Sequence, residues 1–577
     1  MKKKLLPALI VTGLIILVVI IMGITALINK YTPTKKTEDL KEYFNISSDD
    51  EAALIVDNEL SDYKAKIIDK KIYVDYKFVH DSLNSRFYWD ANENVLLYTT
   101  ASDIISAAAD SNSYSVTKQT NDFGYPIVKA TSDSALIALD YVKQYSNITF
   151  KSYDDPARIV ITSKWDEIDS ATVSKSTQVR VKGGIKSPIL KEVKKDDKIT
   201  ILDSGDKWDK VATEDGVIGY IKGKALSESK KTKLTNPDYE EETFTHIKKD
   251  KDICLAWNQV TSQSANSKVP QVISSTKGIN VMSPTWFYLN DNNGNLADIA
   301  SKDYVSYCHS QGIEVWGLFS NFENTDVDAA YVLTHTSTRT TLINQIMSAA
   351  FNYELDGVNI DFENITEAAY GDSYIEFIRE LAIKCHNNGI SLSVDVTVPA
   401  SFNKFFNRSD MANFADYIVI MGYDEHYKGS DAGSVSSIPW VTEGVESTLK
   451  EVPADQIILG MPFYTRIWEL TPKEDDDAVT DTEDQSKYTV ASQVYSMDAA
   501  AAQLATNNAT AALDEESGQN YAEWSASNKL YKVWLEDSTS LEKRLKLVDD
   551  NKLAGAAFWK LGFENSSVWD TVIKYLN

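Results

Sequence analysis

The chain has 577 residues, 43% of them hydrophobic, which is enough for several packed domains. Its formal net charge of −26 argues against nucleic-acid binding, because phosphate groups would be repelled. The three cysteines, Cys254, Cys308 and Cys385, are too few and too scattered for a disulfide framework or a zinc site, so we expect buried free thiols.

The N-terminus has lysines at positions 2–4, followed by an uncharged run from Leu5 to Ile28. The run is long enough to cross a bilayer as a helix, and the lysines favour a cytoplasmic N-terminus. A cleaved signal peptide is the alternative, but the run is long for one and no Ala-x-Ala site closes it. We expect residues 1–30 to be a cytoplasmic tip and an uncleaved single-pass anchor in the cell membrane, with the rest extracytoplasmic. So few cysteines fit an exported protein of a Gram-positive bacterium.

Residues 31–48 are polar and aperiodic and are interpreted as a linker. Residues 49–166 alternate β-like and helical runs, which predicts an α+β stalk domain. The expected strands are Ala53–Val56, Lys71–Val74, Val95–Tyr98 and Arg158–Thr162, and the expected helices are Ser102–Ala109 and Ser134–Tyr145. The runs Ile67–Val74 and Phe87–Asp90 resemble a stalk domain related to the copper amine oxidase N-terminal domain. No His or Cys cluster accompanies them, so we expect a spacer or wall-contact module without copper.

Short alternating strands with Gly, Asp and Ser turns fill residues 170–227 and predict a small all-β barrel. The order of these strands, with Gly219-Tyr220-Ile221 in the last, resembles the bacterial Src-homology-3-like domain. The resemblance implies binding of cell-wall peptide. Trp208 and Tyr220 could line a peptide groove, and core positions fit them equally well. A second polar linker is expected over residues 228–245.

Strand-like and helix-like runs alternate from residue 246 to 577 and predict a C-terminal (β/α)8 TIM barrel. The expected strands are Ile253–Trp257, Gly278–Thr285, Glu314–Phe319, Gly357–Phe362, Ser391–Thr397, Tyr417–Tyr423, Gln456–Phe463 and Gly555–Lys560. The helices between them include Tyr304–Gln311, Thr340–Asn352 and Tyr374–Asn387. In such barrels, polar residues at the C-terminal ends of the strands form the active site.

The fourth expected strand has the most informative pattern in the chain. With a period of two, the segment Leu355–Glu363 has one apolar face and one face that carries Asn359, Asp361 and Glu363. Groups two residues apart on a strand lie about 6–7 Å apart, so the proton affinity of at least one acid is raised. A carboxylic acid that stays protonated near neutral pH is what glycosidic cleavage needs as its general acid. A solvated acidic strand end is the alternative for an isolated Asp-x-Glu.

This segment resembles the catalytic strand of glycoside hydrolase family 18, whose pattern is Asp-Gly-x-Asp-x-Asp-x-Glu. Asp356, Gly357, Asp361 and Glu363 match, and Asn359 stands where the middle Asp usually lies. An Asn there is similar to the branch of bacterial cell-wall and spore-cortex hydrolases. Three later motifs are similar to the family in the same order, namely Met421-Gly422-Tyr423-Asp424, Gly460-Met461-Pro462-Phe463-Tyr464-Thr465-Arg466, and Trp559.

The resemblance implies retaining, substrate-assisted cleavage that needs no metal or other cofactor. Glu363 would protonate the leaving oxygen, Asp361 would orient the substrate's acetamido N–H, and Tyr423 would hydrogen-bond the acetamido oxygen. Because Asn359 cannot titrate, we expect it to keep Asp361 ionised. The expected substrate-binding residues are Asp356, Asp424, Trp559, Arg466, Tyr464 and Trp286.

A mechanism that uses an N-acetyl group requires an N-acetylated sugar, such as those of peptidoglycan or another N-acetylglucosamine polymer. The anchor and the wall-type accessory domain favour peptidoglycan, cleaved at β-1,4 bonds after N-acetylglucosamine. A chitinase is one alternative, and a tethered, non-catalytic carbohydrate-binding barrel is the other.

Two regions of the expected barrel stay open. The acidic stretch from Glu474 to Asp484 lacks the spacing of a calcium-binding EF-hand and is interpreted as a solvated loop. Residues Tyr488–Trp534 are an insertion that we expect to wall one side of the cleft. Asp514 and Glu523 lie in this insertion, and neither is assigned to the site.

Overall fold

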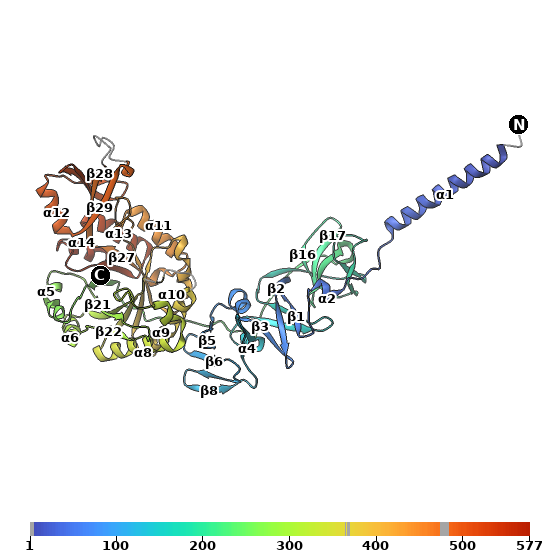
Figure 1. Cartoon of the computed structure of the whole chain (residues 1–577), viewed down its shortest axis with the longest axis horizontal. Coiled ribbons are helices and arrows are strands. Elements are labelled where there is room, and N and C mark those ends of the chain that lie inside the picture. Colours follow the sequence, from blue (N-terminus) through green and yellow to red (C-terminus); the bar gives the residue numbers. More distant parts are fainter. Residues whose placement is uncertain (1–4, 364, 366–369, 474–483, 577) are drawn as a thin grey trace. The chain divides into compact units, whose positions relative to one another are not determined.

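The computed structural model describes residues 5–363, 365, 370–473 and 484–576, and the chain forms two compact units (Figure 1). The first unit comprises Met1–Phe87, Ala107–Tyr114 and Asp122–Glu241. The second comprises Tyr88–Ser106, Ser115–Asn121 and Glu242–Asn577.

The first unit begins with helix α1 (Leu5–Tyr31). Its segment Leu9–Tyr31 has a mean hydropathy of 2.9, and none of it is buried within the structure. The apolar helix expected from the sequence is therefore present. Its length and composition suit a membrane span, and a signal sequence near an N-terminus has the same properties.

Within the described residues, two seven-stranded sheets form the body of the first unit. Their strand orders are β11-β12-β1-β2-β3-β10-β9 and β15-β14-β18-β17-β16-β13-β19. The first contains β1 (Glu51–Val56), β2 (Glu59–Ile68), β3 (Lys71–Asp75), β9 (Val128–Ala130), β10 (Ala135–Ala138), β11 (Thr149–Tyr153) and β12 (Arg158–Thr162). The second contains β13 (Glu167–Thr172), β14 (Thr177–Arg180), β15 (Ile189–Val193), β16 (Lys198–Asp203), β17 (Trp208–Thr213), β18 (Ile218–Lys222) and β19 (Lys230–Lys233).

The helix expected over Ser102–Ala109 is wrong. Residues Ile104–Ala108 form strand β6, in which the buried side chains alternate with less buried ones, as strand periodicity requires. The helix expected over Ser134–Tyr145 is half right, because β10 precedes a short helix, α4 (Leu139–Gln144). Short apolar runs do not distinguish a strand from a helix by periodicity alone.

The prediction that residues 31–48 form a linker is also wrong. Thr37 pairs with Ile189 of strand β15, and short helix α2 (Leu40–Tyr43) is followed by Phe44, which is fully buried. Phe44 packs into a core that contains Ile55 and Val179. The segment therefore belongs to the packed unit. Similarly, β19 lies inside the second expected linker and pairs with β13.

The second unit contains a closed barrel of eight parallel strands in the part of the chain that the structure describes. The strands are β20 (Ile253–Asn258), β21 (Val281–Leu289), β23 (Glu314–Ser320), β24 (Gly357–Asp361), β25 (Ser391–Thr397), β26 (Tyr417–Met421), β27 (Ile457–Pro462) and β33 (Gly555–Trp559). Strand β20 pairs with both β21 and β33, which closes the barrel. The predicted TIM barrel is confirmed.

Amphipathic helices surround the barrel strands (Figure 1). They include α6 (Lys302–Ser310), α8 (Thr336–Tyr353), α9 (Gly371–His386), α10 (Arg408–Phe414), α11 (Ile438–Thr448), α13 (Ser538–Asn551) and α14 (Val568–Tyr575). Their apolar faces and the outward faces of the strands form one continuous core. All three cysteines are buried and free, as predicted.

A second sheet is inserted between barrel strands β27 and β33. Its strand order is β29-β28-β32-β31-β30. The elements are β28 (Tyr464–Pro472), β29 (Tyr488–Ser496), α12 (Met497–Thr506), β30 (Ala512–Asp514), β31 (Gln519–Ala526) and β32 (Lys529–Leu535). The acidic stretch of the sequence analysis falls largely on residues 474–483, which lie outside the described residues.

A hairpin from the N-terminal half of the sequence belongs to the second unit from Tyr88 onward. It is made by β4 (Phe87–Asp90) and β5 (Val95–Thr99). The Asp90 carboxylate accepts hydrogen bonds from the backbone N–H and the hydroxyl of Thr336 at 2.7 and 2.6 Å. Helix α8 begins at Thr336, and its own N-cap residue, His335, makes no capping bond. The hairpin thus supplies the cap that helix α8 lacks.

Candidate active site

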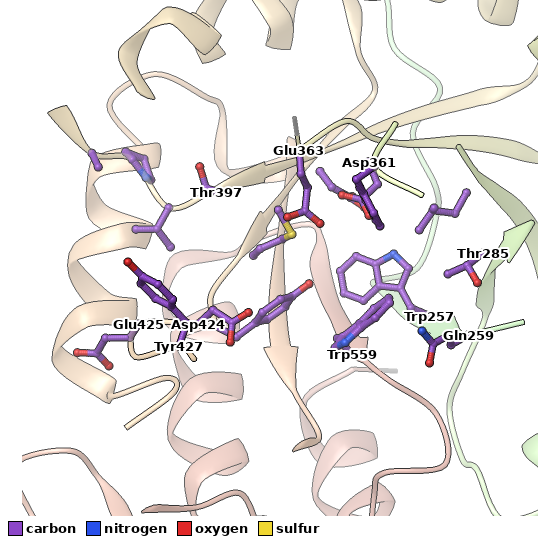
Figure 2. Close-up of a pocket in the computed structure, with 18 of the residues that line it drawn as sticks. Trp257, Gln259, Thr285, Asp361, Glu363, Thr397, Asp424, Glu425, Tyr427 and Trp559 are labelled. Atoms are coloured by element: carbon purple, nitrogen blue, oxygen red, sulfur yellow. The ribbon is translucent and has the colours of Figure 1, made fainter. Parts of the chain in front are cut away.

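A cleft of about 620 Å³ lies at the C-terminal ends of the barrel strands. Carboxyl groups and aromatic rings line it together (Figure 2). Asp361 and Glu363 come from the end of β24, Trp257 from β20, and Trp559 from the end of β33. The barrel brings these residues together from distant parts of the sequence, because parallel strands end at the same rim.

The two acids predicted on the catalytic strand both face this cleft (Figure 2). Asp361 is 6% exposed, and its Oδ1 is a buried atom without a hydrogen-bond partner in the described structure. Glu363 is open to the cleft, yet the surrounding walls limit its contact with bulk water. This burial, together with the nearby carboxylates of Asp424 and Glu323, raises the pKa of Glu363. Glu363 therefore tends to carry the proton that a general acid must donate.

Tyr423 and Asp424 follow strand β26 and line the same cleft. Burial and the neighbouring Asp361, Asp395 and Glu363 raise the pKa of Tyr423, so its hydroxyl remains a hydrogen-bond donor. The Tyr464 hydroxyl donates to Asp424 Oδ1 at 2.5 Å.

Two predicted binding residues support the cleft from behind. Arg466 Nη2 lies 3.6 Å from Asp424 Oδ1, and Tyr464 is buried beneath the same carboxylate. Neither side chain is among those that line the cleft. Both side chains contact Asp424, which does line the cleft.

Aromatic rings form the apolar side of the cleft. The ring centroids of Trp257 and Trp559 lie 6.0 Å apart at an interplanar angle of 63°. Trp257 also meets Tyr423 edge to face, with centroids 6.4 Å apart. Such rings present flat apolar surfaces of the kind on which a sugar ring stacks, beside acids that contact its polar groups.

Asn359 precedes Asp361 by two residues on β24, so it lies on the same face of the strand, and it is completely buried. Its Oδ1 accepts hydrogen bonds from Trp257 Nε1 and Ser283 Oγ, both at 3.0 Å. Its Nδ2 donates to Ser393 Oγ at 3.0 Å and to Asp395 Oδ1 at 2.7 Å. The amide therefore has a donor or acceptor partner on every side and holds four strands of the barrel together.

Residues 323–564 match the family model of the glycosyl hydrolases family 18. The barrel is a glycosyl hydrolase family 18 domain. The chain is 24% identical over 301 residues to the uncharacterized glycosylase YvbX of Bacillus subtilis (strain 168), a match that covers 49% of this chain and 81% of that protein. It is 24% identical over 287 residues to the cortical fragment-lytic enzyme of the same organism, covering 48% of this chain and 63% of that protein.

Among solved structures, the family 18 domain is similar to the spore cortex-lytic enzyme SleL of Bacillus megaterium QM B1551. The TM-score is 0.49 at 19% identity, and the match covers 60% of this chain and 77% of that chain. The family predicted from the sequence, and with it the glycoside hydrolase class, is confirmed by the family match.

Two residues predicted to bind substrate lie elsewhere in the family 18 domain. Asp356 precedes β24 and is therefore at the N-terminal end of the barrel, where it accepts hydrogen bonds from Val315 N and His309 Nε2, both at 2.8 Å. Trp286 is fully buried and donates through Nε1 to Asn266. Trp286 faces the surrounding helices because Ser283 and Thr285 of the same strand face inward. Both predictions are wrong.

The prediction that Asn359 keeps Asp361 ionised is wrong as well. Burial and the charges of Asp395, Glu363 and Glu323 raise the pKa of Asp361 well above its usual range. Asp395, which lies in β25, and Glu323, which follows β23, were not predicted from the sequence. A lone carboxyl inside the apolar run Leu392–Val396 is the signal that could have revealed Asp395, because a buried acid needs a reason.

The insertion does not wall this cleft. In the part of the chain that the structure describes, none of the residues that line the cleft belongs to the insertion. Asp514 borders a neighbouring pocket, and its carboxylate accepts a hydrogen bond from Ser517 Oγ at 2.5 Å. Glu523 is exposed and accepts one from the Tyr521 hydroxyl at 2.6 Å.

Proposed function

We propose that this protein is a membrane-anchored glycosidase that cleaves β-1,4 bonds after N-acetylglucosamine in peptidoglycan, with retention of configuration. The observation that supports it most is the position of Glu363, an acid with a raised pKa at an open cleft, beside Asp361 and Tyr423. Family 18 enzymes are an exception to the scheme of two catalytic carboxylates, because the substrate's own acetamido group acts as the nucleophile.

In the first step, Glu363 gives its proton to the glycosidic oxygen while the acetamido oxygen of the same sugar attacks C1. The C1–O bond breaks, the leaving chain departs as an alcohol, and an oxazolinium forms on the enzyme-bound sugar. Asp361 stabilises the positive charge next to the acetamido nitrogen, and the Tyr423 hydroxyl donates to the acetamido oxygen. Trp559, supported by Trp257, holds the ring.

In the second step, a water molecule attacks C1 and the carboxylate of Glu363 takes its proton. The C1–O bond to the acetamido oxygen breaks, and the acetamido group is restored. Two inversions at C1 give net retention, so the first product is the β-anomer. Asp424, held by Tyr464 and Arg466, is placed to accept hydrogen bonds from sugar hydroxyls.

Several features support peptidoglycan as the substrate. The relatives at the matched region include enzymes named for lysis of cortical fragments. The apolar helix α1 is suited to hold the enzyme at a membrane, next to a wall. In the first unit, Trp208 and Tyr220 lie next to Gly183 on the expected Src-homology-3-like barrel, where we propose that wall peptide binds.

The substrate is tested by incubating the purified protein with peptidoglycan and, separately, with chitin oligomers, then identifying new reducing ends by mass spectrometry. We expect fragments of peptidoglycan that end in N-acetylglucosamine, released faster than any product from chitin. Faster cleavage of chitin would establish a chitinase instead. Binding of either polymer without cleavage would establish a carbohydrate-binding barrel.

The anchor is tested by fractionating cells that express the chain with a C-terminal tag. We expect the full-length chain in the membrane fraction after an alkaline carbonate wash, and cleavage of the tag region by external protease. A soluble, shortened chain in the medium would show that α1 is a cleaved signal sequence.

A further inference from the structure

A second buried carboxyl group faces the catalytic Asp361. Asp395 is 3% exposed, lies between Val394 and Val396 in β25, and lines the cleft. Strands β24 and β25 are parallel neighbours, with Ile360 opposite Val394. Asp361 and Asp395 are each the next residue along, so they stand at the same height on strands about 4.8 Å apart. Side chains at equal heights on neighbouring strands point to the same face, which here is the inside of the barrel.

The amide of Asn359 distinguishes these two carboxyl groups. Its Nδ2 donates to Asp395 Oδ1 at 2.7 Å, whereas Asp361 Oδ1 has no partner among the described residues. The amide orientation is set by Trp257 Nε1 and Ser283 Oγ, which both donate to its Oδ1. A hydrogen-bond donor stabilises an ionised carboxylate, so negative charge is favoured on Asp395 and the proton on Asp361.

Among the described residues, the other titratable groups around this pair are acids or phenols. Glu323 and Glu363 approach Asp361 from the rim, and Tyr423 and Tyr374 approach from β26 and helix α9. Each of these groups is either neutral or negative, so none offsets a second buried charge. Burial raises the pKa of both aspartates, while the hydrogen bond from Asn359 lowers that of Asp395. Two adjacent buried carboxyl groups of this kind hold one proton between them.

We propose that Asp395 is a positioning residue that takes the place of the acid missing at position 359, by sharing one proton with Asp361. The role in the reaction rests on the proposed function. In the resting enzyme the proton lies on Asp361. When the oxazolinium forms, the O–H bond on Asp361 breaks and one forms on Asp395, which leaves Asp361 negatively charged beside the positive acetamido group. The transfer conserves charge within the pair and needs no other reactant.

The test compares the full-length parent with the variants Asp395→Asn, Asn359→Asp, and Asn359→Asp combined with Asp395→Asn. Each is assayed for kcat/KM against pH with soluble, uncross-linked peptidoglycan strands. We expect Asp395→Asn to lower kcat/KM roughly tenfold or more, a factor that corresponds to a shift of about one pKa unit. The acidic limb of its pH profile of kcat/KM should move to lower pH, because Asp361 loses a negatively charged neighbour. Asn359→Asp should retain turnover and move this limb to higher pH, because it adds an acid.

The double variant is the decisive comparison, since it returns the acid to position 359 and the amide to position 395. We expect it to be more active than Asp395→Asn and to have a pH profile close to that of the parent. A purely structural role for Asp395 predicts additive losses with unshifted limbs, and that result would overturn the proposal. If Asp395→Asn does not fold, the acidic limb of the pH profile of Asn359→Asp is the remaining test. An unshifted limb in that variant would refute the proposal.

A second readout does not depend on any activity. Because the folded pKa of both aspartates lies above the unfolded value, the pair lowers stability as pH rises between these values. Unfolding of the parent is therefore expected to become easier from pH 5 to pH 8 by more than that of Asp395→Asn. A parent with this pH dependence but no glycosidase activity would refute the proposed function and keep the proton-sharing pair. Equal pH dependence in both proteins would refute the pair.

Discussion

We expect the replacement of Glu363 by Gln to abolish the proposed hydrolysis of N-acetylated glycans and to leave glycan binding in place. The amide matches the size of the carboxylic acid but has no proton to give to the leaving oxygen. Loss of a general acid typically costs ~10²–10⁴-fold in rate. We expect a loss in kcat of this order or more, measured as the appearance of reducing ends, with a binding constant for the glycan that changes little.

The matched control is Glu446→Gln, which changes the same group on the exposed face of helix α11. It should retain the activity of the parent. The pH dependence offers a further check, because a general acid must be protonated. Since burial, Asp424 and Glu323 raise the pKa of Glu363, the rate should fall only as pH rises through that raised value. An active Glu363→Gln variant would contradict the assignment of the acid.

The second large effect is on stability and concerns Arg339, a fully buried residue of helix α8. Arg339 Nε donates to Glu380 Oε1 of α9 at 2.9 Å. Its Cζ lies over the Tyr88 ring of the hairpin β4–β5, 5.0 Å from the ring centroid. Arg339→Met removes the cation that is hydrogen-bonded to the buried Glu380 carboxylate and leaves only the more distant charge of Lys384. Breaking a buried ion pair from one side costs ~3–5 kcal/mol, so we expect a loss of this size in the free energy of unfolding, measured with denaturant.

The effect of Arg339→Met should grow with pH. Burial raises the pKa of Glu380 to about 7 even with Arg339 present, and removing the cation raises it further. An acid whose folded pKa is raised loses stability as pH rises through that value, so the loss should be larger at pH 8 than at pH 5. Combining Arg339→Met with Glu380→Gln should recover part of the loss. Lys302→Met, an exposed site on α6, is the control for the change in charge. Equal losses at both pH values would contradict this account.

The barrel was predictable because its strands are long, apolar and separated by clear helical patterns. The expected strand over Ser391–Thr397 matches β25 residue for residue, and the expected helix over Tyr304–Gln311 is shifted by no more than two residues from α6. The N-terminal modules were harder, since their strands are short. Phe44 shows the reason: it is buried in a core that also contains Ile55 and Val179, distant residues that no local pattern connects with it.

The part of the candidate site that lies on a single strand was predictable. Asp361 and Glu363 were found by alternation within a single segment. The position of Asp395 beside Asp361 depends on the register between two strands. The cap that Asp90 supplies to helix α8 joins residues 246 positions apart. Asp356 was misplaced because a motif does not state at which end of the strand each member lies. Trp286 was misplaced because its direction depends on which face of the strand points into the barrel. The inward contacts of Ser283 and Thr285 show that Trp286 faces outward.

The most direct test of the mechanism is the anomeric configuration of the first product, followed by proton NMR during cleavage of soluble N-acetylated glycan strands. Attack by the substrate's acetamido group, followed by water, predicts that the β-anomer appears first and then equilibrates with the α-anomer. Early appearance of the α-anomer would mean a single inverting displacement by water. That result would contradict the roles assigned to Glu363, Asp361 and Tyr423.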